Sequence, residues 1–134
     1  YYTATDSAQD VQRLAIAKAK LEGFLNSPQQ TFVQYKETDT SFPARYARAI
    51  AYYRATDTDK ALKALDALLA EQPDNPYLWE LKGQVLFEAG RAAEAEAPHR
   101  RSVELKPEAP LFRINLAQAM LAQTEGKRDL AKIE

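Results

Sequence analysis

The sequence holds a single histidine, His99, and no cysteine. A zinc site normally needs several histidine or cysteine ligands, so His99 would need carboxylates to complete one. The acidic residues around it fall on a charged helix face that we expect to be solvated: Glu94, Glu96, Glu104 and Glu108. We therefore interpret His99 as a packing or partly exposed residue, and we expect no metal and no cofactor in this chain.

The sequence also lacks the short motifs that carry catalytic chemistry. It has no HExxH, no glycine-rich phosphate loop and no GxSxG. The pair Arg100-Arg101 is too short for a nucleic-acid patch, and a formal net charge of −1 favours neither nucleic acid nor an anionic membrane as a partner. No apolar run approaches the ~20 residues of a membrane span. We expect no catalytic residues, so that this chain is not itself an enzyme.

Equivalent residues recur at a fixed interval of 34 positions. The series are the small residues Ala49, Gly83 and Ala117, the alanines Ala61 and Ala95, and the prolines Pro73 and Pro107. A period of ~20–50 residues indicates a stacked array, and a 34-residue helix–turn–helix unit is typical of the tetratricopeptide repeat. The small residues would let paired helices approach closely, and each proline would end one helix before the next repeat begins.

Within one repeat the match to the tetratricopeptide pattern is partial. Trp79, Gly83, Ala95 and Pro107 occupy four of its positions, whereas Lys82, Leu86 and His99 replace the usual Leu, Tyr and Phe. We predict an all-α fold, a tetratricopeptide-like α-α superhelix of antiparallel helix pairs that forms one domain over residues 1–134. Its expected parts are an N-terminal pair (1–41), repeats at 42–75 and 76–109, and a partial repeat at 110–134.

Local signals place the helices. Ser27-Pro28 and Asn75-Pro76 are expected caps followed by a first-turn proline, and Gly90 is an expected left-handed end. The expected helices cover about 8–26, 28–37, 43–56, a segment from Asp57, 76–90, 92–106 and 110–123, and a new helix begins near Asp129. In the first helix, Val11, Leu14, Lys18, Leu21 and Leu25 recur at steps of three and four and predict one apolar face.

The first helix of every pair in such an array lines its concave side. The expected groove residues are Tyr46, Ile50, Tyr53, Arg54, Glu80, Gln84, Phe87, Asn115, Gln118 and Leu121. Aromatic anchors mixed with amide and charged groups suit a peptide or an extended protein segment. For Tyr53 and Phe87 the sequence leaves open whether the rings line the groove or pack between helices, and Tyr52 is expected to pack.

Several segments together resemble one narrower family. They are AKLEGFL (19–25), SFPARYARAIAYYR (41–54), QPDNPY (72–77), ELKGQ (80–84) and EAGR (88–91). They are similar to the C-terminal tetratricopeptide region of bacterial M48-family zinc metallopeptidases, the periplasmic kind involved in outer-membrane protein quality control. The resemblance implies a substrate- or partner-binding module attached to a protease domain, with the zinc motif in that preceding domain.

The resemblance also sets expectations about partners and location. It implies a periplasmic protein whose partners are proteins or peptides, including the upstream protease domain. The lack of a long apolar run separately leads us to expect no membrane insertion. The chain begins with Tyr1 rather than Met, so we interpret it as a piece of a longer protein with its signal upstream. Where chaperone-tail binders of this fold carry a clamp of lysines and asparagines, this chain has Tyr46, Ile50, Glu80 and Gln84, so we expect no terminal carboxylate in the groove. The alternatives are a free-standing scaffold or assembly factor, and an enzyme in its own right.

Overall fold

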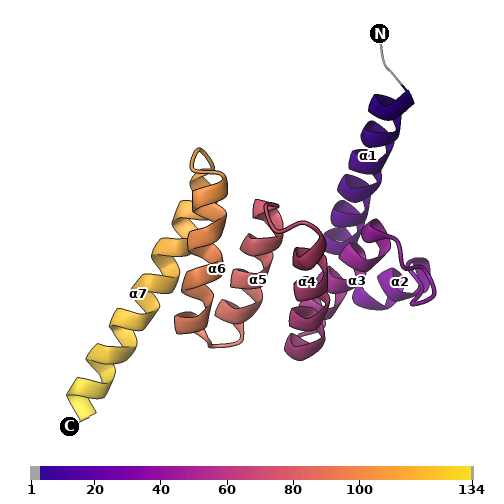
Figure 1. Cartoon of the computed structure of the whole chain (residues 1–134). Coiled ribbons are helices and arrows are strands. Elements are labelled where there is room, and N and C mark those ends of the chain that lie inside the picture. The colour runs from indigo at the N-terminus through magenta and orange to yellow at the C-terminus, as the bar shows by residue number, and fades with distance from the viewer. Residues whose placement is uncertain (1–3, 134) are drawn as a thin grey trace. The chain divides into compact units, whose positions relative to one another are not determined.

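The computed structural model describes residues 4–133, which form helices joined by short turns (Figure 1). The helices are α1 (Ala4–Leu25), α2 (Pro28–Gln34), α3 (Phe42–Arg54), α4 (Thr58–Glu71), α5 (Pro76–Glu88), α6 (Ala92–Leu105) and α7 (Pro110–Ile133). These described residues contain no strand, and the predicted all-α fold is confirmed. The chain forms two compact units, and the boundary between Leu68 and Leu69 falls inside α4. No described helix is both long enough and apolar enough to cross a bilayer.

The predicted helix ends are confirmed where the sequence carries capping residues. Ser27 and Gln30 form a reciprocal capping box before α2, with Pro28 in the first turn. The Asn75 side chain accepts a hydrogen bond from the backbone N–H of Tyr77 at 3.0 Å. Gly90 has a φ of 79° and ends the α5 segment in the left-handed region. These groups satisfy backbone donors and acceptors that a helix end leaves without partners.

The turn after α3 adopts the same left-handed conformation without a glycine. Thr56, 34 residues before Gly90, has a φ of 57°. Left-handed backbone is disfavoured for a β-branched residue. The repeat geometry therefore imposes this conformation at a position where local preference opposes it.

Unit 1 is built around α3, against which both α1 and α2 pack. The closest approach of α1 is at Gly23, where an added Cβ would lie 3.1 Å from the Ile50 side chain. Among the α1 positions from residue 7 onward, Ala19 and Gly23 are the buried ones. The predicted apolar face of α1 is wrong as a buried face, because Val11, Leu14, Leu21 and Leu25 are each more than half exposed. Small residues face α3, and the buried apolar area comes from the larger side chains of α3.

Unit 2 is a three-helix arrangement in which α6 packs against both α5 and α7. Gly83 of α5 lies directly under the His99 ring of α6, whose atoms would be 2.6–2.7 Å from a Cβ at Gly83. Ala95 and Ser102 of α6 are also buried. The close helix approach that the sequence predicted at Gly83 is therefore confirmed.

The last part of the chain differs from prediction. A single helix, α7, runs from Pro110 to Ile133 through Gly126, so the predicted end near Gln123 and the separate start near Asp129 are wrong. A glycine inside a helix costs only about 1 kcal/mol relative to alanine, which does not outweigh the helix formers around it. Ala117 is exposed although Ala49 and Gly83 are buried, because no later helix in the described chain packs against α7.

Candidate functional site

His99 is a buried packing residue, with only 1% of its surface exposed. Its ring covers Gly83, and its Nδ1 atom has no hydrogen-bond partner. Burial lowers the pKa of His99 below its ordinary value of 6.5, and the backbone of Gly83 offsets only part of this shift. The described residues contain no group of three or more histidine, cysteine, aspartate or glutamate side chains placed to hold a metal ion. His99 therefore contributes to the contact between α5 and α6.

The lowered pKa of His99 predicts that the protein loses stability in mild acid. The unfolded chain takes up a proton near pH 6.5, whereas the folded chain resists protonation until a lower pH. The contribution is therefore complete above about pH 6.5 and is lost as the pH falls toward the folded-state pKa. Urea unfolding followed by Trp79 fluorescence at several pH values measures this loss, because α5 carries both Trp79 and Gly83.

A matched variant isolates the histidine from the carboxylates, which also titrate in acid. Leu65 occupies the position 34 residues before His99 and is fully buried. In a His99→Leu variant the loss of stability between pH 7 and pH 5 should be smaller than in the unsubstituted chain. An unchanged pH profile in the variant would contradict the assignment to His99.

Two of the predicted groove residues of unit 1, Ile50 and Arg54, contact α1. The side chains of Tyr46 and Ile50 are buried, so the expectation that they face a ligand is wrong. The Arg54 guanidinium donates hydrogen bonds to the carbonyl oxygens of Gly23, at 3.1 Å, and Asn26. These carbonyls end α1, where a cation is favourable because the last turn carries partial negative charge.

The two aromatic residues near the end of α3 differ in their surroundings. Tyr53 is half-buried and remains a candidate groove residue. The Tyr52 ring contacts Phe32 of α2, with ring centroids 5.0 Å apart. Tyr52 therefore packs between helices, as the sequence predicted.

The predicted groove residues of unit 2 come together on α5 and α7. The Asn115 side chain of α7 donates a hydrogen bond to the Glu80 carboxylate of α5 at 3.3 Å. Gln84 donates to Glu88 at 2.8 Å along α5, and Phe87 is half-buried on the same helix. Farther along α7, Gln118 and Leu121 are exposed. Here a part-buried polar contact joins the two helices, and the side chains beyond it reach solvent.

Two residues of this surface were missed in the sequence. Leu111 and Ile114 of α7 are both more than half exposed. Together with Gln118 and Leu121 they follow steps of three, four and three, which place all four on one helix face. The same spacing rule, applied backward from Gln118, would have found them. We name this set (Leu111, Ile114, Gln118 and Leu121) the α7 stripe.

Comparison with known proteins agrees with this geometry. Residues 46–110 match a family described as tetratricopeptide repeat. The fold is a tetratricopeptide-repeat fold. Such repeats are typically non-catalytic and mediate protein–protein interaction, and the described helix pairs repeat at the interval on which the family is defined.

The chain is also similar to parts of three longer proteins. It is 35% identical over 68 residues to a peroxisomal targeting signal receptor of Eremothecium gossypii, covering 51% of this chain and 12% of the receptor. It is 29% identical over 91 residues to a beta-barrel assembly-enhancing protease of Yersinia pestis, covering 68% and 18%. Human tetratricopeptide repeat protein 13 is 28% identical over 117 residues, covering 82% and 14%. The chain thus spans only a minor part of each relative.

Proposed function

We propose that this tetratricopeptide chain binds an extended peptide or protein segment along the α7 stripe and the neighbouring α5 residues of unit 2. The observation that carries this proposal is the stripe itself, which leaves three large apolar side chains and one amide in solvent. Contiguous exposed apolar side chains bordered by polar groups are typical of protein interaction sites. The Glu80–Asn115 contact supplies the polar border on one side.

The chemistry of this surface favours an extended ligand over a compact one. The leucine and isoleucine side chains can pack against apolar side chains of a ligand. The Gln84 and Gln118 amides can donate hydrogen bonds to the ligand's backbone and accept them from it. An extended segment exposes both kinds of group along its length. A terminal carboxylate is not required, because no lysine lies among the groove residues of α5 and α7.

We further propose that the parent protein is a periplasmic M48-type zinc metallopeptidase and that this chain holds its substrates or partners. The segment resemblance and the 29% identity to a beta-barrel assembly-enhancing protease support this proposal. Determining the gene sequence that precedes the Tyr1 codon tests it: the reading frame should encode an HExxH helix and an export signal. A frame without them would favour a free-standing scaffold or assembly factor, which the likeness to a targeting receptor and to a human repeat protein also supports.

The binding proposal is tested with a double variant, Ile114→Ser with Leu121→Ser. Both side chains are exposed, so helical content measured by circular dichroism should stay unchanged. Affinity for peptides selected from an array of outer-membrane β-barrel sequences should fall by about tenfold or more, since each apolar anchor contributes on the order of 1 kcal/mol. Fluorescence anisotropy of labelled peptides gives the dissociation constants.

A second double variant serves as the control. Val11→Ser with Leu14→Ser removes two side chains of similar exposure from α1, outside the proposed surface. It should leave peptide affinity unchanged. Equal losses in the two double variants would show non-specific apolar binding and would overturn the assignment to the α7 stripe.

A further inference from the structure

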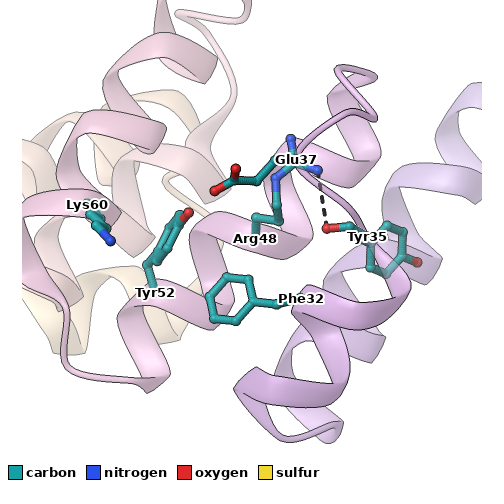
Figure 2. Close-up of a pocket in the computed structure, with 6 residues that line it drawn as sticks. All are labelled: Phe32, Tyr35, Glu37, Arg48, Tyr52 and Lys60. Carbon is teal, nitrogen blue, oxygen red and sulfur yellow. Dashed lines mark hydrogen bonds between the residues drawn. The ribbon is translucent and has the colours of Figure 1, made fainter.

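A pocket of about 390 Å³ opens within unit 1, between α2, α3 and the first turn of α4 (Figure 2). It is lined by Phe32, Tyr35, Glu37, Arg48, Tyr52 and Lys60. Its volume lies at the lower end of the ~300–1,000 Å³ range of small-ligand pockets, which suits one or two residues rather than a long segment. None of its six residues belongs to the predicted groove.

The pocket exists because α2 is short. It has 7 residues, whereas the second helices of the two later pairs, α4 and α6, have 14 each. The chain leaves the helix at Tyr35 and reaches α3 through a loop rather than through further helical turns. One side of α3 therefore meets loop backbone, and the Arg48 and Tyr52 side chains line an open space.

Arg48 carries a buried charge whose guanidinium is hydrogen-bonded to backbone carbonyls rather than to a carboxylate. It is only 8% exposed, and its guanidinium donates hydrogen bonds to the backbone carbonyls of Tyr35 (3.4 Å), Lys36 (2.5 Å) and Asp39 (2.8 Å). No described carboxylate forms a salt bridge with it. Buried charges are usually paired, so this fixed cation at the pocket wall can receive an anion without losing side-chain freedom.

The remaining walls combine an aromatic surface with two oppositely charged groups. Phe32 and Tyr52 form a tilted ring pair, and the Lys60 Nζ atom lies 5.8 Å from the centroid of the Tyr52 ring. The Lys60 Nζ atom lies 3.8 Å from an Asp57 carboxylate oxygen, and both side chains are exposed. An exposed ion pair of this kind contributes little to stability. Glu37 forms no hydrogen bond or ion pair with any described residue, and Figure 2 shows its carboxylate directed over the Tyr52 hydroxyl.

We propose that this pocket binds an aromatic residue with a free α-carboxylate. The ring packs on Phe32 and Tyr52, and the carboxylate lies between the cations of Arg48 and Lys60. The α-nitrogen donates to the Glu37 carboxylate. A cationic ligand would be opposed by the two basic side chains. An uncharged ligand would supply no counter-charge to Arg48, Lys60 or Glu37.

An aromatic residue with a free α-carboxylate can come from two sources: a free aromatic amino acid, or the C-terminal residue of a peptide. The α-nitrogen distinguishes them, because it is a charged ammonium in the free amino acid and a neutral amide in a peptide. Titration of the full chain with L-phenylalanine, N-acetyl-L-phenylalanine and L-phenylalaninamide, followed by ¹H–¹⁵N NMR, tests both. L-Phenylalanine and N-acetyl-L-phenylalanine, which carry a free carboxylate, should shift the backbone resonances of Glu37 and Lys60. L-Phenylalaninamide, which lacks one, should not.

Variants then assign the roles. Lys60→Gln should weaken binding of N-acetyl-L-phenylalanine about fivefold, whereas the control Lys63→Gln, an exposed lysine on the same helix and outside the pocket, should not. Glu37→Gln should weaken only L-phenylalanine, since a neutral amide oxygen still accepts from a peptide N–H. If the unsubstituted chain binds L-phenylalanine no better than N-acetyl-L-phenylalanine, the ligand is the C-terminal residue of a peptide.

Three results would each overturn the proposal. The first is L-phenylalaninamide shifting the same resonances with the same affinity as the carboxylates. The second is Lys60→Gln and Lys63→Gln changing affinity equally. The third is an absence of shifts at the pocket with every probe in a protein that circular dichroism shows to be folded.

Discussion

Replacing Gly83 by leucine should lower the free energy of unfolding by about 3 kcal/mol, the upper end of the usual range for overpacking. Even a single Cβ at this position would lie 2.6–2.7 Å from the His99 ring, well inside van der Waals contact. The ring is buried and lies against α5, so it can yield only if α5 and α6 separate. Urea unfolding followed by the fluorescence of Trp79, on the same helix, measures the change.

Gly126 gives a control with the opposite sign. It also lies inside a helix, but an added Cβ there meets no atom within 4 Å. Gly126→Ala should therefore raise stability by up to about 1 kcal/mol through helix propensity alone, whereas Gly83→Ala should lower it. If both alanine variants stabilise the protein, the close contact between Gly83 and His99 does not constrain the helix pair.

Replacing Arg48 by alanine should lower the free energy of unfolding by about 2–3 kcal/mol. The substitution leaves three part-buried backbone carbonyls of the loop after α2 without the donors that now satisfy them, and acceptors that lose their partners away from water are costly. It also leaves a cavity where the guanidinium lay. Thermal unfolding followed by far-ultraviolet circular dichroism measures the loss.

Two further variants separate the causes. Arg48→Lys keeps the charge but cannot donate to three separated carbonyls at once, so it should recover only part of the stability. Lys63→Ala removes an exposed charge from the same unit and should change stability by no more than about 0.5 kcal/mol. An Arg48→Ala variant as stable as Lys63→Ala would show that the loop does not depend on this side chain.

Most of the helix ends before α7, and the close packing at Gly83, could be predicted from the sequence. Serine, asparagine and glycine at Ser27, Asn75 and Gly90 act within a few residues of where they stand, so their effect could be predicted locally. The interval of 34 residues carried similar information over longer range, because Ala49 and Gly83 are both buried, whereas Ala117, the third member of the series, is exposed. This reasoning predicted a close helix approach at Gly83, and the structure shows that the group packed there is the His99 ring.

Which helix faces are covered could not be predicted from the sequence and is seen only in the folded chain. The spacing of Val11, Leu14, Leu21 and Leu25 indicates an apolar face, yet α1 buries Ala19 and Gly23 instead, because small residues allow closer approach to Ile50. In the same way, Tyr46 and Ile50 of α3 are covered and belong to the core, whereas the α7 stripe is left in solvent. Periodicity gives the face on which side chains gather, but coverage depends on a neighbouring helix whose presence and distance a local pattern does not contain.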